Sequence, residues 1–345
     1  MLLGWFFGIQ VARLRLGFLP PSTMVFFVVG WIPLVLVATI ARRLRNPRLQ
    51  RALIATLVSI ALIAPAVATA TVPAISQLRT APIPGLPTLV VSASPHGNAD
   101  LYLLQNGGQQ IQRLTTSPEA ELMPDLSRDG RRVVYVSDAS GTRDLYVMDL
   151  DAQGRPIAQT AITHDDTWED EPHWSPDGTR IVFTVRTGSG SDIAIVDADG
   201  HHRVYLTNDH TSFNPSWSPD GSSIAFRRPA PLPPADDDIW IMRDDGSHAR
   251  DVIQVPGPQW GPSWSPDGSS IAFSATPAGD VDVLIANIDG TGLSNLTAGS
   301  RDRDEAFGWT PDGHVLFLSD RSHTGGTFLY FMDIDGSHVQ LSVIL

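Results

Sequence analysis

Two long uncharged runs lie near the start of the chain, and a region of short apolar runs follows them. Residues 24–41 and 52–72 contain no charged side chain, and their lengths of 18 and 21 residues match the roughly 20 residues that cross about 30 Å of hydrocarbon. From residue 89 onward, short apolar runs alternate with clusters of Pro, Gly, Asp and Ser, which predicts short strands joined by turns. The pattern therefore divides the chain into a membrane-spanning part and a β-rich part.

A basic loop between the two apolar runs sets their expected orientation. Residues 42–51 contain five Arg, and short loops this basic stay in the cytoplasm. We therefore expect a transmembrane hairpin whose second helix returns the chain to the extracytoplasmic side. Residues 1–23, which are apolar with two Arg, are expected to lie in the membrane interface. Residues 73–88 contain four Pro and predict an extended linker.

A cleavable signal peptide is the alternative interpretation of the second apolar run. Residues 48–70 combine a basic start, an apolar middle, a helix-breaking Pro65 and small residues at 66–70, as signal peptides do. Cleavage there would release the β-rich part and leave the first helix, 24–41, unexplained. Both interpretations export the β-rich part.

A seven-residue motif recurs along the β-rich part. Three near-identical copies of Pro-x-Trp-Ser-Pro-Asp-Gly and two weaker ones begin at Pro172, Pro215, Pro262, Pro124 and Phe307. The glycines of successive copies are 48, 43, 47 and 45 residues apart, and four-stranded propeller blades repeat every 40–50 residues or so. The repeat predicts an all-β, six-bladed β-propeller of four-stranded blades over residues 89–345, preceded by the two transmembrane helices.

Each part of the motif has a structural role. Ser-Pro-Asp-Gly suits a type I turn that Ser caps, and the Trp before it supplies an apolar wedge that we expect between blades. The strands that follow the turns form six units, at 89–115, 133–163, 181–207, 224–254, 271–297 and 315–341. The first unit has no turn motif ahead of it. Either linker residues 82–88 or C-terminal residues 343–345 are expected to complete its blade, because an open ring exposes sheet edges.

These residues resemble the TolB-type propeller repeat of bacterial periplasmic and surface proteins. The resemblance rests on the Trp-Ser-Pro-Asp-Gly copies at Trp174, Trp217 and Trp264, and it covers residues 89–341. It implies the propeller fold, whereas it implies little about chemistry because propellers host many activities. TolB itself is similar only in the propeller and has an α/β domain where this chain has the predicted helices, so a role in the Tol-Pal system is not carried over.

Charge divides the chain at the same boundary. The chain has no Lys and no Cys, and its first 80 residues hold eight Arg without a carboxylate. The remainder holds 16 Arg and all 37 acidic residues, a formal charge of −21. This charge argues against a nucleic-acid partner, because phosphate binding needs clustered basic residues. The lack of Cys excludes disulfides, thiol catalysis and Cys-based zinc sites.

Catalytic and cofactor motifs are absent from the sequence. It contains no Gly-x-Ser-x-Gly, no His-Glu-x-x-His, no phosphate loop and no dinucleotide fingerprint. His201, His202 and His248 are placed at turns and are expected to be solvated. The Asp-x-Asp-Gly segments 197–200 and 333–336 lack the further ligands of a calcium loop, and we interpret them as turns. We therefore expect no cofactor, no metal and no enzymatic activity.

The irregular loops offer a better candidate site. Propeller topology places the loops between blades on the face opposite the Ser-Pro-Asp-Gly turns, where they rim the central channel. An acidic rim with two exposed Trp suits a cationic peptide, a divalent ion or a carbohydrate, and a plain solvated loop set is the alternative. His173 is expected at the channel wall, as a structural hydrogen-bonding group rather than a ligand. The candidate rim residues are Glu121, Trp168, Glu169, Asp170, Glu171, His173, Asn214, Trp260, Arg303, Asp304 and Glu305.

Two functions fit these patterns. The first is a propeller anchored in the cell membrane on its extracytoplasmic side, which binds or scaffolds a protein, peptide or glycan without catalysis. The alternative is a propeller-type lyase or hydrolase of polysaccharide or peptide that uses channel carboxylates with His173. A sensor is disfavoured, because the expected cytoplasmic loop of ten residues leaves no room for an output domain.

Overall fold

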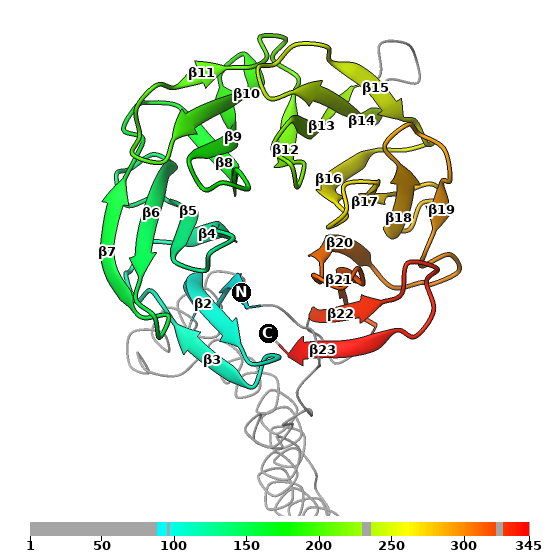
Figure 1. Cartoon of the computed structure of the whole chain (residues 1–345), viewed down its shortest axis with the longest axis horizontal. Coiled ribbons are helices and arrows are strands. Elements are labelled where there is room, and N and C mark those ends of the chain that lie inside the picture. Colours follow the sequence, from blue (N-terminus) through cyan, green and yellow to red (C-terminus); the bar gives the residue numbers. More distant parts are fainter. Residues whose placement is uncertain (1–87, 95–96, 230–235, 322–326, 345) are drawn as a thin grey trace, which may run out of the picture. The chain divides into compact units, whose positions relative to one another are not determined.

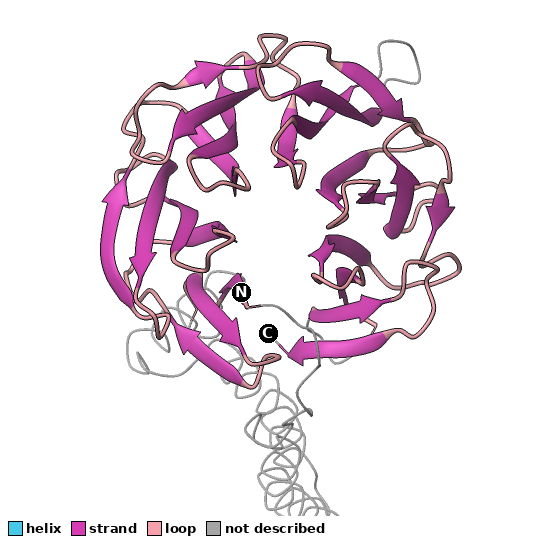
Figure 2. Ribbon diagram, in the orientation of Figure 1, coloured by secondary structure: helices cyan, strands magenta, loops and turns pink. Residues whose placement is uncertain are grey.

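The computed structural model describes residues 88–94, 97–229, 236–321 and 327–344. These residues form six antiparallel sheets arranged as blades around a central opening (Figure 1, Figure 2). The predicted interfacial segment, the two predicted transmembrane helices and nearly all of the linker lie outside the described residues. Within the described part, no helix has the length and apolar character that a membrane crossing needs.

The first three blades follow one another in sequence. Within each blade, the strands follow chain order from the centre of the ring to its outer edge. Blade 1 has three described strands, and blades 2 and 3 have four each. The strands are β1 (Leu89–Ala93), β2 (Asp100–Gln105) and β3 (Gln110–Arg113); β4 (Glu121–Leu126), β5 (Arg132–Ser137), β6 (Asp144–Leu150) and β7 (Pro156–Ala161); β8 (Trp168–Trp174), β9 (Arg180–Thr187), β10 (Gly190–Asp197) and β11 (Val204–Tyr205).

Blades 4 to 6 continue the ring with four strands each. Together the six sheets confirm the predicted all-β, six-bladed propeller. The strands are β12 (Phe213–Trp217), β13 (Ser223–Pro229), β14 (Asp237–Arg243) and β15 (Arg250–Ile253); β16 (Gln259–Trp264), β17 (Ser270–Ala275), β18 (Asp282–Asn287) and β19 (Ser294–Asn295); β20 (Asp304–Trp309), β21 (Val315–Ser319), β22 (Phe328–Met332) and β23 (Gln340–Ile344).

The Ser-Pro-Asp-Gly turns join the innermost strand of a blade to the second strand. In blade 3 the Gly178 amide donates to the Ser175 carbonyl oxygen at 2.8 Å, and the Ser175 hydroxyl donates to Asp177 at 2.6 Å. Gly178 has a φ of +69°, which glycine adopts without a steric penalty. The same bonds recur at Ser218 and Ser265, so the turns form as the motif predicted.

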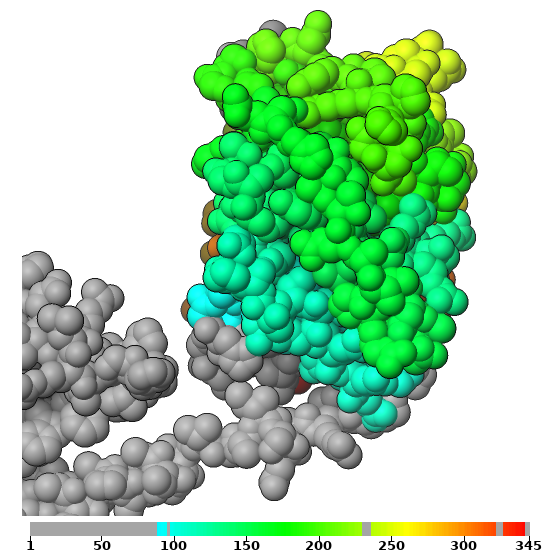
Figure 3. All heavy atoms as spheres, turned by 90° about the vertical axis from the view of Figure 1, so that its left-hand side faces the viewer, coloured from blue at the N-terminus to red at the C-terminus, as the bar shows by residue number. Residues whose placement is uncertain are grey.

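The hydrophobic core is divided into six clusters, one at each junction between neighbouring blades. Equivalent positions on the second strands carry large, fully buried aromatic side chains in five blades. These are Tyr135, Phe183, Phe226, Phe273 and Phe317. Figure 3 shows the side chains of blades 1 to 3, coloured cyan to green, packed continuously along the outer side of the propeller. Because each cluster needs two blades, the blades stabilise one another in a ring.

The motif tryptophans fill the junctions as predicted. Trp174 of blade 3 packs with Val134 and Val136 of blade 2, and the Arg132 guanidinium lies 4.5 Å from the centre of its ring. The indole N–H of Trp264 donates to the Ser216 carbonyl oxygen of the preceding blade at 3.2 Å. The tryptophans are therefore interblade wedges. The indole N–H groups of Trp264 and Trp309 reach a carbonyl oxygen of the preceding blade, whereas those of Trp174 and Trp217 have no partner among the described residues.

Blades 6 and 1 meet through side-chain packing. Val91 and Leu104 of blade 1 lie in one buried cluster with Leu316 and Leu329 of blade 6. The C-terminal strand β23 pairs with β22 as the outermost strand of blade 6. The expectation that residues 343–345 complete blade 1 was therefore wrong, because a tight turn makes pairing with the adjacent strand the shorter route. The other expectation, linker residues 82–88, falls almost wholly outside the described residues.

Candidate functional site

The innermost strands of blades 2 to 6 enclose a central channel with a cavity of about 520 Å³. Each of these strands contains a shift in register just before the motif Trp or, in blade 2, before Leu126 at the same position. In four of them the residue at the shift has a positive φ. We call these four the bulge ring: Met123 at 50°, Glu171 at 56°, Asn214 at 48° and Gly261 at 63°. All four line the cavity, and such bulges commonly redirect a side chain beside a functional site.

The bulge ring is strained at three of its four positions. A residue other than glycine in the left-handed region costs about 1–3 kcal/mol, and a following proline favours an extended conformation instead. Each bulge-ring residue precedes a proline. Gly261 occupies the position without this cost, so the fold itself does not require a side chain there. The side chains of Met123, Glu171 and Asn214 therefore need a separate explanation.

Glu171 has a structural explanation. Its carboxylate accepts the Asn214 backbone N–H at 2.9 Å and the Thr184 hydroxyl at 2.8 Å. The bulge frees that N–H from the strand ladder, and an unpaired buried donor would destabilise the blade. The carboxylate of blade 3 thus secures the innermost strand of blade 4. Met123 Sδ lies 3.4 Å from the Glu171 N–H, and a thioether is only a weak acceptor.

His173 lines the channel next to Glu171, and its side chain is 45% exposed. Its Nδ1 lies 3.7 Å from Asp125 Oδ2, which also accepts the Trp174 N–H at 2.8 Å. Partial desolvation would lower the pKa of the imidazole, but the Asp125 and Glu171 carboxylates outweigh it and raise the pKa above its usual value. Among the described residues, no group of three or more His, Asp and Glu side chains is arranged to hold a metal ion.

The predicted rim residues all lie on innermost strands or directly before one, but they separate into three environments. Glu171, His173 and Asn214 line the channel. A second group is buried: Glu121, Glu169, Asp170 and Asp304. The remaining four lie at the surface or are half-buried, and they do not line the channel cavity: Trp168, Trp260, Arg303 and Glu305. The acidic rim is therefore largely internal, because its carboxylates bind donors within the fold.

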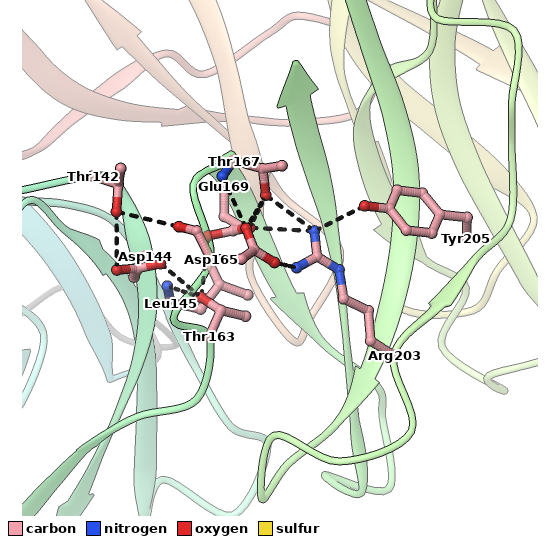
Figure 4. A network of polar contacts seen from close by, with 9 residues as sticks. All are labelled: Thr142, Asp144, Leu145, Thr163, Asp165, Thr167, Glu169, Arg203 and Tyr205. Carbon is pink, nitrogen blue, oxygen red and sulfur yellow. Dashed lines mark hydrogen bonds and ion pairs between the residues drawn. The ribbon is translucent and has the colours of Figure 1, made fainter. Parts of the chain in front are cut away.

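Glu169 is the centre of a buried network that joins blades 2 and 3 (Figure 4). Its carboxylate accepts the Thr167 hydroxyl at 2.7 Å, the Thr163 hydroxyl at 3.1 Å and the Arg203 guanidinium at 3.2 Å. Arg203 also pairs with Asp165. Burial raises the pKa of Glu169 to about 7, although the hydroxyl of Thr167 and the charge of Arg203 oppose the shift.

The first five blades each have a buried aspartate at or near the start of one strand: Asp100 in β2, Asp144 in β6, Asp192 in β10, Asp238 in β14 and Asp282 in β18. A threonine hydroxyl donates to this aspartate in blades 2, 3 and 5, whereas the additional donors differ between junctions. Gln259 Nε2 donates to Asp238 at 2.9 Å, and His210 Nδ1 lies 2.7 Å from Asp192. In the aligned repeats, Glu169 of blade 3 takes the position that Gln259 has in blade 5. Glu169 instead accepts three donors, so the equivalent positions take part in different networks.

Trp168 is the most exposed aromatic residue of the predicted rim, at 51%. The Arg143 guanidinium lies 5.4 Å from its ring centre and 3.0 Å from Asp170 Oδ1. Arg186 Nε binds the other oxygen of Asp170 at 2.5 Å. The buried Asp170 therefore positions the Arg143 guanidinium against the Trp168 ring, which remains half-exposed.

Sequence reasoning missed most of the residues that line the channel cavity, among them Met123, Asp125 and Phe307. The sequence feature that could have indicated these residues is their position in the aligned copies of the motif. Met123 takes the position of Glu171 and Asn214, whereas Phe307 replaces the proline of the other copies. Single-residue departures from a repeat were visible, but only the bulge geometry shows that these positions line the channel.

Comparison with known families identifies the repeat. The TolB beta propeller domain matches residues 63–250 and 179–344 of this chain. The chain belongs to this family. The Tol-Pal system protein TolB of Anaeromyxobacter dehalogenans is 32% identical over 107 residues, which are 31% of this chain and 23% of that protein. The chain thus matches less than a quarter of that relative's length.

Two solved structures place the propeller in a wider context. TolB from Acinetobacter baumannii is 22% identical with a TM-score of 0.62, over 74% of this chain and 64% of that one. An oligogalacturonate lyase from Vibrio parahaemolyticus is 20% identical with a TM-score of 0.53, over 74% of this chain and 73% of that one. At these identities the likeness concerns the fold alone.

Proposed function

We propose that the chain is a membrane-anchored, extracytoplasmic propeller that binds a protein partner without catalysis. We call the face with the Ser-Pro-Asp-Gly turns the turn face, and the opposite face, with the loops between blades, the loop face. The partner's segment lies over the loop face and enters the channel between the innermost strands. The main supporting observation is the channel of about 520 Å³, whose wall holds three non-glycine residues at positive φ and the half-exposed His173, together with the exposed Trp168 of the predicted rim. Strain of this kind is retained where function uses it.

The anchor and the compartment are part of the same proposal. They rest on the uncharged runs 24–41 and 52–72, on the basic loop between them and on membership of the TolB propeller family. A relative carries the name of the Tol-Pal system, which supports a protein partner in a general sense. The identity of that partner is open, because the match to this relative covers only a third of the chain.

Photocrosslinking in native membranes tests this proposal. The full chain carries benzoylphenylalanine in place of Trp168, of Trp260 or, as a control, of Ile157 on the outermost strand of blade 2, which is 67% exposed. The proposal expects a defined crosslinked polypeptide at the rim positions that is absent at Ile157. Equal products at all three positions, or none at the rim, would exclude a partner at this face.

A second candidate function follows from His173. Its raised pKa, its Asp125 partner and its exposure in the channel give it the features of an acid–base group, and the fold is shared with an oligogalacturonate lyase. Under this alternative the purified full chain would cleave polygalacturonate or another acidic polysaccharide, and His173→Ala would abolish the activity. Absence of turnover in the wild-type chain, with binding retained, would leave the non-enzymatic proposal.

A further inference from the structure

The outermost strand of blade 2 has an unprotected edge. β7 lies at the end of its sheet on the outer side of the ring (Figure 1), and no described strand pairs with its outer edge. Its six residues are exposed or half-buried, and none of them carries a charge. Such an edge offers a row of free N–H and C=O groups to a further strand, which proteins usually prevent with short or charged edge strands.

The outermost strands of most other blades have this protection. β11 and β19 have two residues each. β3 ends in Arg113, and β15 opens with Arg250 and Asp251. β23 contains no charged residue either, but it is shorter than β7, with five residues. β7 is therefore the longest uncharged edge in the described part of the propeller.

The hydrogen bonds of β7 show which of its backbone groups face outward. The Ile162 N–H donates to the Leu145 carbonyl oxygen at 2.8 Å, and the same register pairs Thr160 with Val147. In an antiparallel pair, alternate residues exchange hydrogen bonds with the partner strand. The N–H and C=O groups of Thr160 therefore point to β6, whereas those of Gln159 point away from the sheet and are available to a further strand.

Charge favours a second copy of the chain as the occupant of this edge. The residues after position 80 carry a formal charge of −21, so two copies repel each other over most of their surfaces. Residues 156–163 contain no charged side chain. Ile157 within them is 67% exposed, the largest exposed fraction of any large apolar residue in the described part of the chain. An uncharged, apolar edge suits an identical edge, because a two-fold axis brings the same patch of both copies together.

We propose that the chain forms a homodimer in which β7 of one copy pairs antiparallel with β7 of a second copy. The two four-stranded blades then form one continuous sheet, and a two-fold axis at Gln159 or Thr160 relates the copies. Pairing of two six-residue edges buries less than the roughly 1,200–2,000 Å² of a standard stable interface, so the dimer dissociates on dilution. The dimer uses a surface away from the channel and the loop face, and it does not depend on the proposed function.

Single cysteine substitutions test the pairing, because the chain has no native Cys. Full chains with Ala158→Cys, Gln159→Cys, Thr160→Cys or Ala161→Cys are expressed, oxidised with copper phenanthroline and separated on a non-reducing gel. The disulfide-linked dimer should be strongest at 159 or 160, because the residue at the axis faces its own copy at a Cα separation of about 4.5–5.5 Å. The control is Ile111→Cys on β3, which is 53% exposed and should give at least fivefold less dimer. Equal yields at β7 and at Ile111, as expected if β7 binds β23 or a strand of another protein, would overturn the proposal.

Matched proline substitutions separate strand pairing from simple proximity. Gln159→Pro removes an outward N–H and leaves the bonds between β7 and β6 in place. It should raise the dissociation constant of the full-length dimer at least tenfold in sedimentation equilibrium, with an unchanged circular dichroism spectrum. Ile111→Pro makes the same change on β3, where the register also directs this N–H outward, and should alter the constant less than twofold. If Gln159→Pro dimerises like the wild type, no strand pairing occurs at β7.

Charge reversal provides an independent measurement. Thr160→Lys and Thr160→Glu should each weaken the dimer, because like charges then lie opposite each other, whereas a mixture of the two variants should form a heterodimer. Failure of the mixture to associate would contradict the antiparallel register.

The crosslinking experiment distinguishes this dimer from the proposed function. Benzoylphenylalanine at Ile157 should give a product of twice the chain's mass, whereas the rim positions should give a different polypeptide. A wild-type chain that stays monomeric at its highest soluble concentration overturns the dimer and leaves the proposed function standing.

Discussion

The two faces of the propeller use polar side chains in opposite ways. On the turn face, three turns repeat the same bond from Ser to Asp at 2.6 Å, in blades 3, 4 and 5. On the loop face, a threonine hydroxyl donates to the buried aspartate in three blades, whereas the additional donors differ, with His210 at Asp192 and Gln259 at Asp238. The turn face is therefore uniform, whereas the loop face combines a repeated threonine contact with contacts that differ from junction to junction.

This difference indicates that the turn face serves folding, whereas the loop face positions the residues of the candidate site. A uniform turn adds the same local stability to every blade, and it carries no information about a partner. The individual junctions set the positions of the rim and channel residues, as Asp170 does for Trp168. Substitutions on the turn face should therefore have equal and interchangeable effects, whereas those on the loop face should depend on the junction.

The largest effect on stability is expected from a substitution in the hydrophobic core that both faces share. Phe183→Ala removes a fully buried ring from the cluster between blades 2 and 3 and should lower the free energy of unfolding by about 3–5 kcal/mol. Urea unfolding measures the loss, and hydrogen exchange should show weaker protection on both faces. Ile157→Ala should change stability by less than about 0.5 kcal/mol. A loss of protection on one face alone would show that the faces are not coupled through the core.

A pH-dependent effect is expected on the loop face at Glu169. Its pKa of about 7 lies above the ordinary value of 4.5, so the stability it contributes is complete below about pH 4.5 and is lost as pH rises through about 7. Glu169→Gln should abolish this loss, which makes the variant more stable than the wild type by about 3 kcal/mol at pH 8.5, relative to their difference at pH 4.5. Thermal unfolding across that range measures it. Glu305→Gln, on the same face, should follow the wild-type profile; an unchanged profile in Glu169→Gln would contradict the network.

A smaller and uniform effect is expected on the turn face. Ser175→Ala, Ser218→Ala and Ser265→Ala should each cost about 1 kcal/mol, and equal midpoints in urea would confirm the uniformity. The Ser265 hydroxyl lowers the pKa of Asp267 to about 2, so the stability of this bond is present above about pH 4 and is lost as pH falls through about 2. Costs that differ widely among the three variants would contradict a uniform face.

The smallest effect is expected at Tyr135. Four other blades carry phenylalanine at its position, and its buried hydroxyl has no hydrogen-bond partner among the described residues. Tyr135→Phe should leave the free energy of unfolding unchanged or raise it by up to about 1 kcal/mol, since an unsatisfied buried hydroxyl is costly. Differential scanning calorimetry would detect the shift. A clear destabilisation would instead reveal a partner for the hydroxyl.

The sequence predicted the fold because its signals are local and repeated. The turn at Ser175 to Gly178 forms from four consecutive residues, and the Trp174 wedge needs only the next blade in the ring. The candidate site was predicted less completely. Glu169 and Asp170 were expected at an exposed acidic rim, yet both are buried. Their donors come from other parts of blade 3, because Arg186 lies on β9 and Arg203 lies just before β11, and the sequence alone does not place these side chains together.

By itself, the sequence determined the six-bladed architecture, its turns and the interblade wedge, because short-range periodicity specifies short-range structure. It also indicated which face carries the irregular loops. Only the tertiary structure decided which of those residues face the channel. The register shifts in the innermost strands turn Met123 and Asn214 to the channel wall. The ring geometry brings Phe307 to the same cavity, although it lies 184 residues further along the chain than Met123.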